Sequence, residues 1–211
     1  MKLDSPAVPN LPLGPLEYTA FYQDQYSNVL RLYFNRLENT TRNLLGPDGG
    51  RFLSNPFGSF SSDSDQTAAS TTVAYAITYD VTDISDSVYL SNNSRLNTTY
   101  PGIYNLQFSI QFNNSDTQIH DVDVWAAING TNVSNSNSRF SIPNRHGGVD
   151  GRLIAALNLF LTMQAGDYVE LYWNTSNIAV SVEHFAAGSS PTRPATPSVI
   201  ATMAFVSSIP E

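Results

Sequence analysis

The sequence contains no cysteine, which excludes disulfide frameworks and thiolate chemistry. Stability must therefore come from an apolar core or from the association of subunits. Histidine occurs only at His120, His146 and His184, so few bases are present to activate a serine or threonine nucleophile. The Gly-x-Ser-x-Gly motif of many hydrolases is also missing. These absences favour a protein that is not an enzyme.

Charged residues are scarce as well. They make up 13% of the chain, against roughly 25% in ordinary soluble domains. The net charge is 10 − 18 = −8, and the cations are scattered, which argues against a nucleic-acid partner. The sequence has no apolar run of the length that a membrane span or signal peptide needs. We therefore expect a soluble chain that is neither inserted in a membrane nor exported.

Residues 1–15 carry prolines at positions 6, 9, 12 and 15, which impose extended geometry and remove backbone donors. Small apolar residues stand between the prolines, so this arm cannot pack as a domain. We predict an anchor arm that lies in a groove of another protein, with a loose terminus as the alternative. The anchoring residues would be Leu3, Val8, Leu11 and Leu13.

Residues 16–45 contain neither glycine nor proline and have a helical pattern. Apolar side chains recur at alternating spacings of four and three from Tyr26 to Leu44, the average of 3.5 that a coiled-coil seam requires. We predict a short trimeric bundle, and the alternative is a helix packed on its own domain. The seam contacts would be Tyr26, Leu30, Tyr33, Leu37 and Leu44. A glycine and a proline at positions 46 and 47 end the helix, and residues 46–70 are predicted to be a linker.

Residues 71–211 have a period of two, typical of half-buried antiparallel strands. Eight to ten short strands fit a β-sandwich or jelly roll. Leu153 to Leu161 and Tyr168 to Trp173 are apolar on both faces, and the second face needs a further layer or another subunit to cover it. The predicted trimer contacts of this head are Phe160, Tyr168 and Tyr172. The alternative is that they are ordinary, partly exposed aromatic residues.

Three runs in the head form an ordered set of signals: Pro101 to Phe108, Ile128 to Gly130, and Leu161 to Leu171. Their order and spacing over residues 60–207 resemble the trimeric heads of tumour-necrosis-factor-like and complement-type proteins. The last strand keeps the family's aromatic residue at Phe205 but lacks the usual glycine. The resemblance implies an all-β jelly roll that closes as a homotrimer.

The N-terminal part carries a second resemblance. Leu11 to Pro15, Tyr22 to Leu37 and Ser54 to Asp63 are similar to virion structural proteins of marine tailed bacteriophages, particularly those that infect cyanobacteria. This implies a non-enzymatic fibre or knob protein, made in the host cytoplasm and located in the virion. Residues 1–45 would contact capsid, collar or tail proteins. A capsid decoration or cement protein is the alternative, and a glycan-active enzyme ranks third.

Oxygen donors gather at Asp63 to Asp65 and at Asp80 to Asp86, as Ca²⁺ requires. Neither run has the glycine and glutamate of an EF-hand, so we expect no cofactor and keep Ca²⁺ as the alternative. A strand over His120 to Asp123 would offer at most two ligands on each face, so a polar edge is the better interpretation. His146 is interpreted as a loop residue.

A glycan on the host surface is a candidate ligand. Tyr89 and Tyr100, with Asn92 and Asn93, would stack on sugars and bind them by hydrogen bonds from exposed loops. The same composition is common in any asparagine-rich loop, so plain loop polarity stays open as the alternative.

Overall fold

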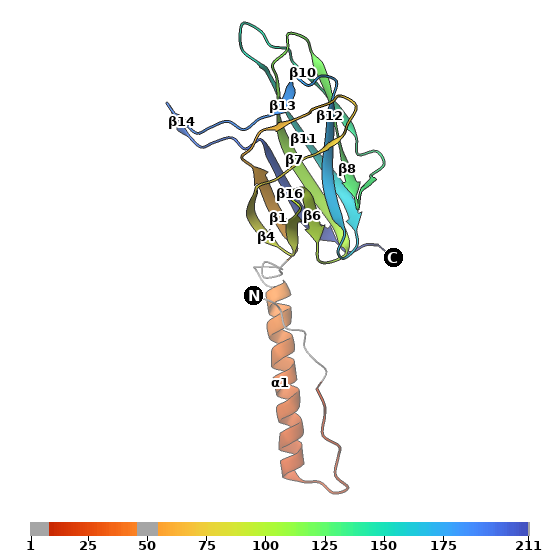
Figure 1. The fold of residues 1–211 in the computed structure, drawn as a ribbon. Coiled ribbons are helices and arrows are strands. Elements are labelled where there is room, and N and C mark those ends of the chain that lie inside the picture. The colour runs from red at the N-terminus through yellow and green to blue at the C-terminus, as the bar shows by residue number, and fades with distance from the viewer. Residues whose placement is uncertain (1–8, 46–54, 211) are drawn as a thin grey trace. The chain divides into compact units, whose positions relative to one another are not determined.

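The computed structural model describes residues 9–45 and 55–210 (Figure 1). The chain divides into two compact units, Met1–Ser54 and Asn55–Glu211, and each is described here by itself. Several predicted positions lie outside the described residues: the anchors Leu3 and Val8, the side chain of Leu44, and the first nine residues of the predicted linker, 46–54.

Helix α1 (Ala20–Leu45) forms most of the described part of the first unit. It begins four residues later than the predicted position 16. Thr19 caps it, because its hydroxyl accepts a hydrogen bond from the backbone N–H of Tyr22 at 3.3 Å. Arg42 in the last turn pairs with Glu38 one turn earlier and faces the negative end of the helix dipole.

The arm over residues 9–18 runs back beside the helix (Figure 1). The Tyr22 hydroxyl donates a hydrogen bond to the carbonyl of Pro12 at 3.2 Å, and the rings of Tyr22 and Tyr26 stack 6.1 Å apart. Leu30 and Tyr33 are half-buried, whereas Leu37 is exposed. Of the predicted anchors, Leu13 is 95% exposed, and Leu11 is 39% exposed. One copy of this unit therefore leaves much of its apolar surface in water.

The second unit contains two seven-stranded sheets with antiparallel ladders. In the first sheet, β4, β1, β16, β7 and β11 lie side by side in that order. β11 pairs with β7 along the whole length of both strands, so β13 and β16 share the opposite edge of β7, and β2 pairs with β13. The bounds are β1 (Phe57–Ser62), β2 (Gln66–Thr67), β4 (Val81–Asp86), β7 (Gly102–Asn114), β11 (Gly151–Met163), β13 (Val180–Val182) and β16 (Val199–Ser207).

The second sheet has the order β10, β8, β12, β6, β5, with β9 beside β8 and β3 beside β12. Asn129 and Gly130 both have positive φ and close the predicted two-residue hairpin between β8 and β9. The bounds are β3 (Tyr75–Ala76), β5 (Val88–Ser91), β6 (Arg95–Thr98), β8 (His120–Ile128), β9 (Thr131–Asn132), β10 (Ser138–Ile142) and β12 (Tyr168–Thr175). β14 (Gly188–Ser189) and β15 (Thr192–Arg193) form a separate hairpin.

A single apolar core lies between the two sheets. Phe112 of the first sheet contacts Trp173 of the second with ring centroids 5.6 Å apart, and both side chains are almost fully buried. Half of the structure is strand, and the only helix in the described residues is α1. The coarse prediction of an all-β sandwich preceded by a helix is therefore confirmed.

The predicted boundary between linker and head is wrong. β1 and β2 occupy residues 57–67, inside the expected linker, and the compact unit starts at Asn55 rather than at residue 71. Phe60 of β1 is fully buried and packs against Tyr79. Glycine and serine dominate this segment, and because that composition is typical of a linker, the sequence pattern did not indicate a strand.

Candidate functional site

Across the neighbouring strands β11, β7 and β16, the outward face of the first sheet carries a single charged residue, Arg152, at one end. On β7, Leu106 and Phe108 point into the core, so Asn105 and its alternate neighbours point outward. The ladder places Phe160 of β11 and Ala204 of β16 on either side of Asn105. We call this surface the uncharged face; it consists of Asn105, Gln107, Ser109, Gln111, Ile154, Ala156, Asn158, Phe160, Ile200, Thr202 and Ala204.

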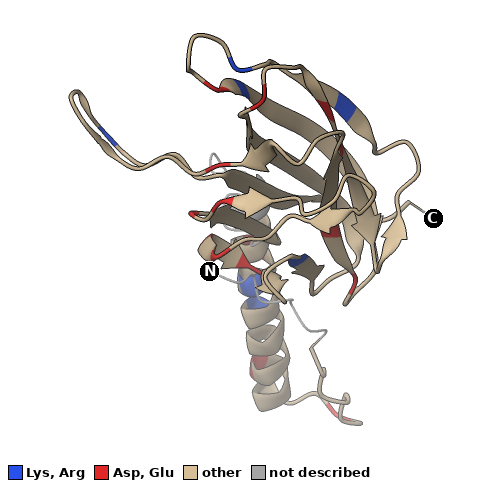
Figure 2. Cartoon of the chain, turned by 45° about the horizontal axis from the view of Figure 1, so that its top comes forward, with Lys and Arg blue, Asp and Glu red and all other residues tan. Residues whose placement is uncertain are grey.

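Apolar side chains on the uncharged face are open to solvent. Phe160 is 63% exposed and Ile154 is 60% exposed, and Figure 2 shows that most of the sandwich ribbon carries no charged residue. Arg152 lies at one end of this face, where its guanidinium stacks 4.5 Å from the ring of Phe185. The Oδ1 atom of Asn105 is buried and has no hydrogen-bond donor within the described residues. Depletion of charge is typical of the core of a protein interface.

Strand β11 forms an edge of the first sheet. It is 13 residues long and pairs with β7 alone among the described strands. Its sequence is rich in leucine and alanine, and Arg152 is its single charged residue. Most proteins protect such an edge with charges, prolines or bulges, because it offers a row of unpaired backbone groups to another strand.

The structure does not bring the predicted head contacts Phe160, Tyr168 and Tyr172 together. Phe160 lies on the uncharged face, whereas both tyrosines belong to β12 of the other sheet. Tyr172 stacks on Trp125 at 6.0 Å, and Tyr168 lies 4.3 Å beneath the guanidinium of Arg95. Periodicity assigns a side chain to one face of its strand, but it does not say which sheet that strand joins.

The outer side of the second sheet contains a groove of about 330 Å³. Asp123 and Trp125 of β8 line it, and Asn174 comes from the neighbouring strand β12. The remaining residues come from β9 and the turn that follows it. We call this site the Trp125 groove; it is lined by Asp123, Trp125, Asn132, Val133, Asn135, Asn137 and Asn174.

The carboxylate in the Trp125 groove is neutralised by its neighbours. Asp123 accepts hydrogen bonds from Nε and Nη2 of Arg139 at 3.0 and 2.9 Å and from the Asn137 amide at 3.3 Å. The Arg139 contact is the main reason why the pKa of Asp123 lies below its usual value, while partial burial opposes the shift. The groove therefore carries an ionised but compensated carboxylate.

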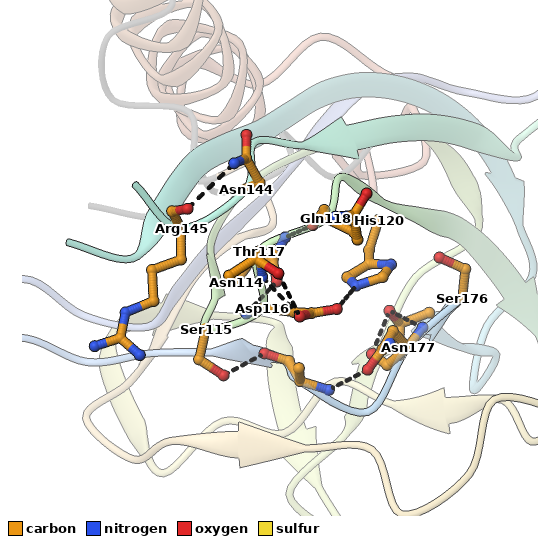
Figure 3. A network of polar contacts seen from close by, with 12 residues as sticks. Asn114, Ser115, Asp116, Thr117, Gln118, His120, Asn144, Arg145, Ser176 and Asn177 are labelled. Atoms are coloured by element: carbon orange, nitrogen blue, oxygen red, sulfur yellow. Dashed lines mark hydrogen bonds and ion pairs between the residues drawn. The ribbon is translucent and has the colours of Figure 1, made fainter. Parts of the chain in front are cut away.

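A polar cluster ties together the loops at one end of the sandwich (Figure 3). The ring of His120 lies 2.7 Å from Asp116, and this contact, with a hydrogen bond from the Thr117 backbone, lowers the pKa of Asp116. The Asn114 amide donates to the carbonyls of Gln118 and Pro143. The side-chain partner of the His120 ring is Asp116, and the contacts of the cluster hold the loops together.

In the two acidic runs that were the candidate Ca²⁺ sites, carboxylate oxygens accept hydrogen bonds from within the protein. Asp80 accepts hydrogen bonds from the backbone of Asp63 and the hydroxyl of Ser64, and Asp83 accepts from the hydroxyls of Ser59 and Ser61. Within residues 9–45 and 55–210, no three histidine, aspartate or glutamate side chains gather in a group that could hold a metal ion.

The other predicted ligand-type residues are separated in space. Asp121 accepts from Ser141, and Asp123 from Arg139, while His120 faces Asp116. His146 lies in an exposed loop and bridges to Val149 through its backbone, as the sequence indicates.

The predicted glycan residues lie elsewhere on the second sheet and its loops. Tyr89 is 48% exposed on β5 and Tyr100 is 50% exposed, while Asn92 and Asn93 form the positive-φ turn between β5 and β6. The Trp125 groove was missed. An outward-facing tryptophan, followed by an asparagine-rich stretch over residues 129–137, was the signal in the sequence that could have found it.

No protein-family model matches the chain, and no curated protein is significantly similar to it. Helix α1 is too polar to cross a bilayer, and it is the only helix in the described residues.

Proposed function

We propose that this chain is a non-enzymatic structural protein of a bacteriophage virion, a trimeric fibre or knob protein. Residues 1–45 bind other virion proteins of the capsid, collar or tail, and the sandwich forms a head that projects outward for attachment to the host. The single observation that carries the proposal furthest is the uncharged face, which one copy of the chain leaves open to water. The sequence resemblance to virion proteins supports the same role.

The strand order supports a jelly-roll head of the tumour-necrosis-factor-like type. One sheet has the order β4-β1-β16-β7-β11, and the other has β5-β6-β12-β8-β10. The chain crosses from one sheet to the other at every step from β2 to β5, at both ends of β7, at both ends of β11, and between β12 and β13. Two sheets joined by such repeated crossings are typical of a double Greek key.

A homotrimer would cover the uncharged face. Burial of a few hundred Å² of apolar surface per chain contributes several kcal/mol at roughly 25 cal/mol per Å², before the cost of association is subtracted. Phe160 and Ile154 supply this apolar area.

Helix α1 supports the same assembly through its seam. Tyr26, Leu30 and Tyr33 lie at the spacings of a coiled-coil seam. Within the described residues of the first compact unit, the arm is the only segment besides the helix that one copy contains. Three parallel copies would bury these side chains against each other as a trimeric coiled coil.

Sedimentation velocity of the full chain at micromolar concentration tests the assembly. We expect a species of about 69 kDa, three times the 23.1 kDa of one chain. A 23.1 kDa monomer with an intact helix would refute both the bundle and the packing of heads. Localisation of the protein on intact particles by electron microscopy tests the virion role directly.

A capsid decoration or cement protein is the second candidate. It is favoured by the open apolar residues before the helix, where Leu13 is 95% exposed and Tyr18 80% exposed, because such a segment fits a groove between capsid subunits. Particles that lack a cement protein would break open at a lower temperature. Particles that lack an attachment fibre would keep their thermal stability and adsorb poorly to host cells.

A further inference from the structure

We infer that the Trp125 groove is a binding site for an uncharged saccharide. This site lies over the paired strands β8 and β12 and the segment 132–137, and it shares no residue with the uncharged face. It is therefore independent of the trimer interface and of the virion role proposed above.

Trp125 gives the groove a rigid aromatic surface. Its indole N–H donates a hydrogen bond to Oδ1 of Asn132 at 2.9 Å, and its ring stacks on Tyr172 at an interplanar angle of 19°. Tyr172 is held in turn, because its hydroxyl donates to the buried carboxylate of Glu170 at 3.3 Å. An aromatic surface fixed in this way offers contact area without a large loss of side-chain entropy on binding.

The polar groups around Trp125 are mostly amides. Asn132, Asn135, Asn137 and Asn174 all line the groove. The side chains of Asn135 and Asn174 make no hydrogen bond to any other described residue, so their amides are open to a ligand. A side-chain amide both donates and accepts, which matches the paired hydroxyls of a sugar ring.

Charge complementarity decides between classes of ligand. The only carboxylate that lines the groove is Asp123, and Arg139 already pairs with it through two hydrogen bonds. Neither an anionic nor a cationic ligand would find an unpaired opposite charge among these residues. A nucleobase could stack on an indole, but the net charge of −8 opposes a nucleic acid. The class of ligand that fits the groove is therefore an uncharged molecule rich in hydroxyl groups.

The size and chemistry of the groove indicate binding without cleavage. Its volume of about 330 Å³ lies at the lower end of the range of roughly 300–1,000 Å³ for small-molecule sites, which suits one or two sugar rings. Hydrolysis of a glycosidic bond needs two carboxyl groups on either side of it. Within the groove, Asp123 has no second carboxyl partner.

An array of immobilised glycans tests this inference on the full chain. The array carries neutral mono- to tetrasaccharides of glucose, galactose, mannose and N-acetylglucosamine, with sialylated and sulfated forms beside them. We expect binding to neutral members only. For the best binder, titration calorimetry should show about a tenfold weaker affinity for Trp125→Ala and a smaller loss for Asn174→Ala. Because the side chain of Asn174 makes no hydrogen bond to another described residue, the second variant tests the site without disturbing the Trp125–Tyr172 stack.

Tyr89→Ala is the matched control, since it removes an exposed aromatic residue from the same sheet outside the groove. It should bind as the parent chain does. Loss of binding in Tyr89→Ala with full binding in Trp125→Ala and Asn174→Ala would overturn the inference. So would a preference for sialylated or sulfated members, or no binding to any member by a folded parent chain. None of these results depends on the oligomeric state, so each is distinguishable from a failure of the virion proposal.

Discussion

At Asp123, hydrogen bonds from Arg139 and Asn137 stabilise the ionised form and lower the pKa of the carboxyl group. A group with a lowered pKa in the folded state stabilises the fold above its unfolded pKa of about 3.9, and this contribution is lost as the pH falls through the folded pKa. We therefore expect Asp123→Asn to reduce the free energy of unfolding at about pH 7, and the difference from the parent to disappear near pH 2.

Urea unfolding at both pH values measures this effect. Asp24→Asn removes the same charge from helix α1, in the other compact unit, and should leave the unfolding of the sandwich unchanged. A loss of stability in Asp123→Asn that is equally large near pH 2 would contradict the assigned role of the charge.

Among the described glycines, Gly151 has the least room for a side chain. A Cβ atom there would clash with the backbone oxygen of Pro143, and Gly151 is the first residue of β11. We expect Gly151→Ala to lower the free energy of unfolding by about 2–3 kcal/mol. The comparison is Gly188→Ala, whose Cβ would meet only the flexible side chain of Arg193, with an expected loss below about 0.5 kcal/mol. Equal effects in thermal melts would disprove the steric argument.

At the scale of the element, the seam of helix α1 makes a direct prediction. Leu30→Asp combined with Leu37→Asp places two charges on each chain, or six in a trimer, at one buried seam. We expect the trimer to dissociate to monomers in sedimentation experiments if the bundle nucleates assembly.

The matched control is Asn28→Asp with Asn35→Asp, which adds the same charges on the opposite side of the helix. This variant should stay trimeric. A trimer that persists in the seam variant would indicate that the sandwich alone suffices for assembly.

Elements with a strong local signal could be predicted from the sequence. The period of two over Tyr104 to Phe112 and over Val122 to Ile128 specified strands β7 and β8, because alternation is a property of neighbouring residues. β1 was missed, because Gly58 and Ser62 occupy buried positions that larger apolar residues usually fill. The assignment of β11 and β12 to different sheets was beyond reach, since strand pairing depends on residues far apart in the chain.

The candidate site was less predictable than the fold. The Trp125 groove joins Asp123, Asn135 and Asn174 from three separate segments, and only the folded chain brings them together. In contrast, the sequence did indicate that β11 has an apolar second face, and Phe160 and Ile154 are exposed there. A local sequence pattern thus shows that a strand has an additional apolar face, but it does not show which residues from other segments lie beside that face.

At the scale of the whole molecule, the uncharged face predicts how the assembly responds to charge and salt. Phe160→Asp adds one charge to each copy of this face and should shift the sedimentation profile toward monomer at micromolar concentration. Tyr89→Asp adds the same charge to an exposed position of the other sheet and should leave the trimer intact.

We expect the proposed trimer to keep its stability between about 0.05 and 1 M salt, because screening acts on charges and the residues of this face are uncharged, with only Arg152 at its end. A trimer that dissociates in high salt would point to an interface elsewhere on the chain.

The long open edge of β11 has a consequence for the newly made chain. Before its neighbours arrive, each copy presents 13 residues of leucine- and alanine-rich backbone with one charge, which is a template for runaway stacking into insoluble fibrils. Because stacking of this kind increases with the concentration of unassembled chain, the soluble recombinant yield should fall when synthesis is fast and rise when synthesis is slowed.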